Sequence, residues 1–165
     1  QYRLGTLYER GLGVKNDLAR ARVWYKRAAE QGNVKSMHNL AVLSAVRQAG
    51  SPDYATAAQW FAEAADRGLA DSQFNLAVLY ESGLGVPKDN AQAFKWLTIA
   101  ARSGDRETVK RRDAMRSRLG AGELEKAEAM IRDWQAKPTE LMSNDARAAG
   151  EAWKQTPAAA TEGNG

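Results

Sequence analysis

The apolar positions of the chain fall at steps of three and four residues, which is the spacing of one face of an α-helix. Two such stretches lie in the first 36 residues: Leu4, Gly5, Leu7 and Tyr8, and then Leu18, Ala21, Trp24, Tyr25, Ala28 and Ala29. The pattern predicts two helices in this unit, a helix A followed by a helix B.

The unit then repeats every 36 residues without a gap. Eight positions keep their residue type through three copies: Leu4, Leu40 and Leu76; Leu7, Leu43 and Leu79; Asp17, Asp53 and Asp89; Ala21, Ala57 and Ala93; Trp24, Trp60 and Trp96; Ala28, Ala64 and Ala100; Ala29, Ala65 and Ala101; Gly32, Gly68 and Gly104. A single helical hairpin cannot bury its apolar face, whereas stacked hairpins bury it against their neighbours. We therefore predict an all-α fold, a curved α/α solenoid of antiparallel helical hairpins with an inner groove.

The repeated polar and small residues support these helix boundaries. Asp17, Asp53 and Asp89 stand where each helix B begins, where a carboxylate accepts bonds from the exposed N–H groups of the first turn. Gly32, Gly68 and Gly104 follow helix B, where a left-handed residue ends many helices. Gly5, Ala41 and Ala77 let the helix axes approach closely. We expect Trp24, Trp60 and Trp96 to fill the space between the helices.

The motif residues resemble a Sel1-like repeat. In the first copy they are Leu4-Gly5, Tyr8-Glu9-Arg10-Gly11-Leu12-Gly13-Val14, Asp17, Ala21, Trp24-Tyr25 and Ala28-Ala29-Glu30-Gln31-Gly32. In the third copy they are Asn75-Leu76-Ala77, Tyr80-Glu81-Ser82-Gly83-Leu84-Gly85-Val86, Asp89, Ala93, Trp96 and Ala100-Ala101. The resemblance covers residues 1–104, in repeats of about 1–34, 35–70 and 71–104. The second copy has Ser44 to Gly50 in place of the Tyr-Glu-x-Gly-x-Gly-Val segment, so we expect a longer helix A and a different turn there.

Several functional expectations follow from this resemblance. Sel1-like repeats are relatives of tetratricopeptide repeats and serve as adaptors in protein complexes, often in bacterial envelope, secretion and signalling contexts, and catalysis is not their usual role. The resemblance therefore implies a protein-binding scaffold with no cofactor.

Residues 105–137 leave the repeat pattern and read as two helices, which we interpret as a C-terminal capping pair. The basic segment Lys110-Arg111-Arg112-Asp113, Leu119 and the Ala/Glu-rich helix after it resemble the periplasmic C-terminal part of alphaproteobacterial PodJ-type polarity proteins. Residues 138–165 form a tail, with a short helix over 139–153 whose face would be Met142, Ala146, Ala149 and Trp153. Residues 156–165 lack core-forming side chains, and we expect them to be mobile.

The composition excludes several kinds of chemistry. The chain has no cysteine and one histidine, His38, which argues against disulfides, thiolate chemistry and a metal site. The Gly-Leu-Gly-Val turns lack the Gly-Lys-Ser/Thr of a phosphate loop, and no Ser/His/acid motif occurs. Chance carboxylate pairs are expected among 20 acidic residues, and we interpret most as solvated. We predict that the protein is not an enzyme.

Two surfaces are candidates for a partner. In tetratricopeptide relatives helix A lines the concave face, so the resemblance points to a groove of Arg3, Thr6, Glu9, Lys35, His38, Asn39, Val42, Asp71, Asn75, Val78 and Glu81. Asn39 and Asn75 can offer donors and an acceptor to a peptide backbone, or can be spacers that are usual in the repeat. His38 occupies the position of Tyr2 and Phe74, which favours packing over metal binding.

The second surface is the basic run Arg106, Lys110, Arg111, Arg112, Arg116 and Arg118. We interpret it as a solvated face rather than as a site for an acidic partner, a glycan or a lipid headgroup. A net charge of +4 is too small to argue for nucleic acid.

The setting of the chain is also an expectation. The chain begins Gln1-Tyr2-Arg3, without a methionine or a signal sequence, so we expect it to be part of a longer protein. It has no run of 18 apolar residues, so we expect this part to be soluble, and the resemblances imply that the parent protein is membrane-anchored. The resemblances imply a periplasmic scaffold in envelope or cell-polarity localisation. Peptidoglycan or another cell-wall glycan is the alternative partner, and the cytoplasm is the alternative compartment.

Overall fold

A computed structural model describes residues 1–46, 51–145 and 147 of the protein. Every regular element within those residues is a helix. The elements are α1 (Tyr2–Arg10), α2 (Leu18–Glu30), α3 (Val34–Ala45), α4 (Tyr54–Asp66), α5 (Ala70–Ser82), α6 (Asn90–Ala100), the 3-10 helix η1 (Ala101–Ser103), α7 (Arg106–Arg116), α8 (Ala121–Asp133) and α9 (Leu141–Asn144). In the described ranges, no helix combines the length and the apolar character that crossing a bilayer requires.

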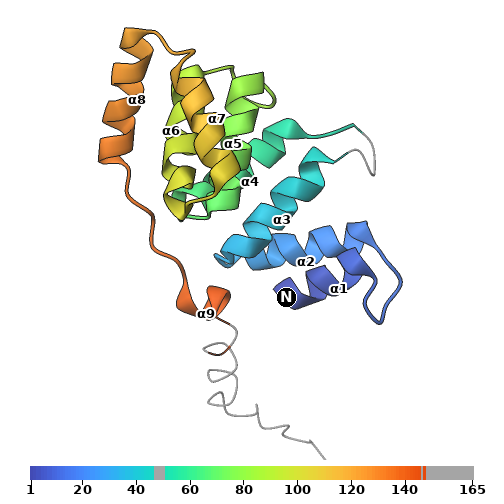
Figure 1. Cartoon of the computed structure of the whole chain (residues 1–165). Coiled ribbons are helices and arrows are strands. Elements are labelled where there is room, and N and C mark those ends of the chain that lie inside the picture. Colours follow the sequence, from blue (N-terminus) through green and yellow to red (C-terminus); the bar gives the residue numbers. More distant parts are fainter. Residues whose placement is uncertain (47–50, 146, 148–165) are drawn as a thin grey trace, which may run out of the picture.

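The helices stack as consecutive antiparallel hairpins (Figure 1). Helix α1 pairs with α2, α3 with α4, and α5 with α6, so each pair is a helix A and a helix B. Each helix B also packs against the helix A of the next pair, α2 against α3 and α4 against α5. The predicted all-α solenoid is therefore confirmed.

Within each pair, a small residue of helix A faces a large buried residue of helix B. A Cβ added to Gly5 would lie 2.6 Å from ring carbons of Tyr25, so the two helices touch where Gly5 has no side chain. The equivalent positions one and two repeats later are also buried: Ala41 and Ala77 on helix A, and Phe61 and Leu97 on helix B. These residues form the seam of each hairpin.

The tryptophans do not all occupy this seam, which corrects the expectation from sequence. Trp96 is buried at 4% exposure, but Trp24 and Trp60 are half-buried. The fully buried position of helix B is the next residue along: Tyr25, Phe61 or Leu97. Arg27 lies over the ring of Trp24, 5.1 Å from its centroid, which fits a ring at the edge of the core.

The predicted helix boundaries are confirmed at their polar ends. The carboxylates of Asp17, Asp53 and Asp89 each accept a hydrogen bond from the backbone N–H three residues later. The three glycines after helix B have φ values of 85° at Gly32, 89° at Gly68 and 83° at Gly104, which a side chain would strain. Local sequence therefore sets where each helix B starts and stops.

The second repeat joins its two helices through the same backbone hydrogen bond as the other repeats, although its sequence between the helices differs. Helix α3 ends at Ala45, whereas α1 and α5 continue to the positions equivalent to residue 46, so the prediction of a longer helix was wrong. The backbone N–H of Asp53 donates to the carbonyl of Ser44 at 2.8 Å, as Asp17 and Asp89 do at the equivalent positions. Residues 47–50 lie outside the described part.

The repeat register continues through α7, although its residue identities have changed. Asp105 accepts a hydrogen bond from the N–H of Thr108, as Asn33 does from Ser36 at the equivalent position. Thr108 is buried like Ser36 and Ser72, and Met115 is buried like Leu43 and Leu79. The structural register of the repeat therefore extends through α7, beyond the residues that carry the sequence motif.

Helix α8 packs against α6, and the chain then returns along the stack (Figure 1). Ala127 of α8 is fully buried, and Trp134 meets Trp96 edge-to-face at 6.2 Å between ring centroids. Of the helix predicted over 139–153, the structure has α9 at Leu141–Asn144. The predicted face residues Ala146, Ala149 and Trp153, and the predicted mobile end at 156–165, lie outside the described residues.

Candidate partner-binding face

Equivalent positions on α1, α3 and α5 form one row along the stack, which we call the A-helix face. It contains the positions predicted for a groove: Arg3, Thr6 and Glu9; Lys35, His38, Asn39 and Val42; Asp71, Asn75, Val78 and Glu81. Arg3, Lys35 and Asp71 are exposed, and the other eight are half-buried. Because the repeat is 36 residues, Arg3, Asn39 and Asn75 occupy equivalent positions on successive helices.

On α1, two of these residues are bound to the seam. The Tyr25 hydroxyl donates to a Glu9 carboxylate oxygen, and it lies 3.2 Å from the Thr6 hydroxyl. Burial, together with the hydrogen bond to Glu9, raises the pKa of Tyr25 to about 12. Thr6 and Glu9 therefore hold the first hairpin together, and Arg3 is the member of this row on α1 that is fully open to solvent.

His38 links the second repeat to the third. Its Nδ1 lies 2.8 Å from the Ser72 hydroxyl, and its ring meets Phe61 edge-on at 5.5 Å between centroids. Burial lowers the pKa of His38, while the charge of Asp71 acts to raise it. These contacts give His38 a packing role between α3 and α5. No group of acidic or histidine side chains within the described residues is arranged to hold a metal ion.

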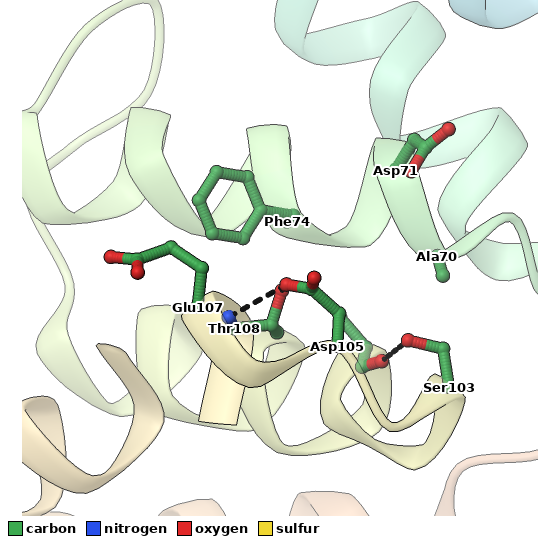
Figure 2. Close-up of a pocket in the computed structure, with 8 residues that line it drawn as sticks. Ala70, Asp71, Phe74, Ser103, Asp105, Glu107 and Thr108 are labelled. Carbon is green, nitrogen blue, oxygen red and sulfur yellow. Dashed lines mark hydrogen bonds between the residues drawn. The ribbon is translucent and has the colours of Figure 1, made fainter. Parts of the chain in front are cut away.

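A hollow of about 290 Å³ opens between the N-terminal ends of α5 and α7 (Figure 2). It is lined by Ala70, Asp71, Phe74, Ala100, Ser103, Asp105, Glu107 and Thr108. Asp71 and Glu107 are both exposed and stand 36 residues apart, so they are the same position on consecutive A helices. The Asp105 carboxylate is already occupied by the N–H and the hydroxyl of Thr108. The hollow therefore has an aromatic wall, Phe74, and two exposed acidic side chains, Asp71 and Glu107, at its rim.

Sequence reasoning included Asp71 in the groove but missed Glu107. The reason is that residues after 104 were interpreted as leaving the repeat. The 36-residue step from Lys35 through Asp71 to Glu107, with a polar side chain each time, is the signal that would have identified it.

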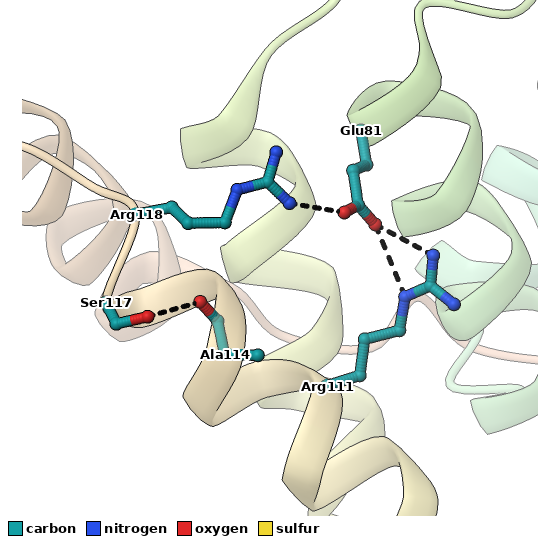
Figure 3. A network of polar contacts seen from close by, with 5 residues as sticks. All are labelled: Glu81, Arg111, Ala114, Ser117 and Arg118. Carbon is teal, nitrogen blue, oxygen red and sulfur yellow. Dashed lines mark hydrogen bonds and ion pairs between the residues drawn. The ribbon is translucent and has the colours of Figure 1, made fainter.

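At the other end of α5, Glu81 is held by two arginines of the C-terminal region (Figure 3). Its carboxylate is 2.8 Å from Arg111 and 2.6 Å from Arg118, and Arg111 also lies over the ring of Phe74 at 5.5 Å. Burial acts to raise the pKa of Glu81, but the hydrogen bonds from the two arginines outweigh it and hold the pKa below its usual range.

These contacts divide the basic run predicted from sequence. Arg111 and Arg118 are bound to Glu81, Arg112 pairs with Asp113 at 2.7 Å, and Arg116 stands 4.0 Å from Glu128. Arg106 and Lys110 are exposed. Part of the run therefore joins α7 to α5.

Replacing Glu81 by glutamine is expected to destabilise the fold by about 1 kcal/mol at pH 7, because two charge-assisted hydrogen bonds weaken at a partly exposed site. The pKa of Glu81 is lowered in the folded state, so its stabilisation is complete above the ordinary glutamate pKa. It is lost as the pH falls through the folded-state pKa. Urea unfolding at pH 7 and at pH 2.5–3, for both chains, measures this. If Glu81→Gln lowered the free energy of unfolding by the same amount, about 1 kcal/mol, at both pH values, the ion-pair account would be contradicted.

Comparisons with known proteins agree with this architecture. The family model for the Sel1 repeat matches residues 1–33, 34–69 and 70–105. A Sel1 repeat protein from Oxalobacter formigenes is similar in structure, with a TM-score of 0.62 and 32% identity over 65% of this chain and 44% of that one. A comparison with curated proteins gave no significant match.

A second solved structure shares the fold over nearly the whole chain. It is a protective antigen of uropathogenic Escherichia coli strains with an SLR fold, with a TM-score of 0.51 and 23% identity over 99% of this chain and 42% of that one. The chain thus spans less than half the length of both solved structures. Repeats of this type generally mediate protein–protein interaction, and proteins built from them are typically non-enzymatic scaffolds. With three matched repeats over residues 1–105, the chain belongs to the Sel1 repeat family.

Proposed function

We propose that this chain is a scaffold module that binds a protein partner across the A-helix face, with the hollow between α5 and α7 as the anchor point. The observation that carries the proposal is that hollow, because Asp71 of the predicted groove lines it and because it combines an aromatic wall with an acidic rim. Exposed, equivalent side chains on successive helices allow one extended or helical segment to be contacted repeatedly.

The chemistry of the hollow favours a partner segment with a long basic side chain. The aliphatic stem of a lysine or arginine would pack on Phe74, and its charge would lie near Asp71 and Glu107. Asn75, half-buried on the next turn of α5, would supply an amide to the partner backbone. A partner segment with a lysine or arginine side chain therefore fits this hollow better than an acidic segment does.

The setting we propose is the periplasm, in an envelope or cell-polarity localisation protein anchored elsewhere in its chain. This rests on the resemblance of residues 110–119 and the following helix to PodJ-type proteins. A cell-wall glycan is the alternative partner class. We favour a protein, because two of the basic residues that motivated the glycan are bound to Glu81.

Charge reversal at the rim tests the proposal. We expect the double substitution Asp71→Lys and Glu107→Lys to reduce partner recovery from an envelope fraction about tenfold or more, as loss of a central charged anchor does. Gln59→Lys, on the exposed side of α4, adds positive charge elsewhere and should leave recovery unchanged. Equal partner recovery with the natural chain, the double variant and the Gln59→Lys chain would exclude the hollow as the anchor.

A further inference from the structure

After α8, the chain runs back along the stack (Figure 1). On the way it contacts residues at the end of each helix B in reverse order. Arg102 after α6 lies over the Trp134 ring at 5.8 Å, Asp66 at the end of α4 binds Lys137, and Gly32 after α2 binds Asn144. Residues 30, 66 and 102 are equivalent in the repeat. We call residues 135–144 the strap, and the row of helix ends and turns at residues 30–34, 66–70 and 102–106 the turn edge.

The strap binds mainly to backbone groups that a helix end leaves without partners. The last carbonyls of a helix have no intrahelical donor. The N–H of Lys137 donates to the Asp66 carbonyl at 2.7 Å, and the Ser143 hydroxyl donates to the Gln31 carbonyl. The Lys137 ammonium also lies 2.8 Å from the Asp66 carboxylate, and this contact raises the pKa of Lys137. A cation is favoured there because the C-terminal end of a helix is negative.

Asn144 binds the turn between α2 and α3 through both polar atoms of its side-chain amide. Its Nδ2 donates to the Gly32 carbonyl at 2.9 Å, and its Oδ1 accepts from the N–H of Val34 at 2.8 Å. The N–H of Val34 is one of the unpaired donors at the start of α3. An aspartate would lose the first bond and an alanine would lose both, so this position selects asparagine.

The strap is docked lightly. Residues 135–140 are all exposed, and most of the contacts described for the strap are polar ones at the surface. Such bonds replace bonds to water and stabilise little, while fixing an extended segment costs conformational entropy. The strap should therefore detach and return readily.

The same edge geometry recurs along the stack. Gly68 and Gly104 have the left-handed φ that Gly32 has, so the turn that Asn144 recognises is repeated after α4 and α6. We propose that the turn edge is a second binding surface, used by a partner peptide that carries a lysine in an extended stretch and, seven residues later, an asparagine in a short helical turn. The strap is its internal ligand and competes with that partner. The turn edge shares Ala70, Ser103 and Asp105 with the lining of the hollow. The two tests change different residues, Asp71 and Glu107 in one and Asp66, Lys137 and Asn144 in the other, so either proposal can fail alone.

The test uses the full chain and a fluorescent peptide with the sequence of residues 133–145, followed by anisotropy. The double variant Lys137→Ala and Asn144→Ala should bind this peptide about two- to threefold more tightly than the natural chain, because a lightly docked internal competitor covers the surface only part of the time. A peptide with alanine at the positions of Lys137 and Asn144 should not bind. Thr139→Ala, an exposed strap position, is the matched control and should behave like the natural chain.

Asp66→Ala, added to the double variant, removes the carboxylate that binds the lysine and should weaken the peptide again. Circular dichroism of each chain checks that the helices remain. The proposal is overturned if the double variant binds the peptide no better than the natural chain, if the alanine peptide binds as well as the natural one, or if Asp66→Ala has no effect.

Discussion

Replacing Phe61 by alanine is expected to lower the free energy of unfolding by about 3–5 kcal/mol, the usual cost of truncating a buried aromatic side chain. Phe61 is 3% exposed and lies at the centre of the stack, in the same core cluster as Ala41, Leu76 and Leu97. Its ring also contacts His38 of the preceding helix. Because it belongs to the seam of the second hairpin and to a core cluster that continues into the third repeat, its loss leaves a cavity that neighbouring helices cannot close. Urea unfolding followed by circular dichroism measures the change.

Trp60→Ala is the matched control, one residue away on the same helix. Trp60 is half-buried and only borders the two core clusters, so we expect a cost of about 1–2 kcal/mol. If Trp60→Ala proved more costly than Phe61→Ala, the tryptophans would form the seam after all.

Replacing Gly85 by alanine is expected to cost about 3–5 kcal/mol, for two reasons that add. Its φ of 71° is strained for any residue with a side chain. A Cβ there would also lie 2.1 Å from the backbone oxygen of Tyr54, so the turn between α5 and α6 would have to move away from the start of α4. Thermal and urea unfolding both report this loss.

Gly13 separates the two causes. It is the equivalent residue of the first repeat, with a φ of 74°, but a Cβ there would meet nothing within 4 Å. Gly13→Ala should therefore cost only the backbone strain, about 1–2 kcal/mol. Equal losses for the two variants would mean that the Gly85 turn does not pack on the preceding repeat.

The features that could be predicted from sequence are those with local causes. Asp17 begins a helix because its carboxylate caps the next turn, and Gly32 follows one because its φ is left-handed. These effects act within four residues, and the 36-residue period then carries them along the chain. The choice between Trp60 and Phe61 is different. Both lie on the apolar stripe, and which one enters the seam depends on the small residue opposite, which only the packed pair reveals.

The sequence was less informative about the partner-binding face. The repeat register predicted that Asp71 and Asn75 share one row, but it could not show that Glu9 is bound to Tyr25 or that Glu81 is bound by α7. Both contacts depend on side chains that meet from different helices. The strap was missed for a related reason, because Asn144 binds backbone groups of a turn 112 residues away and backbone groups leave no sequence pattern.

Hydrogen–deuterium exchange of the Phe61→Ala chain tests the stacked scaffold most directly. If neighbouring hairpins support one another, as the packing of α4 against both α3 and α5 indicates, amide exchange should accelerate in α3 and α5 as well as in α4. Faster exchange confined to α4, with α3 and α5 unchanged, would show that the repeats do not support one another and would contradict the account.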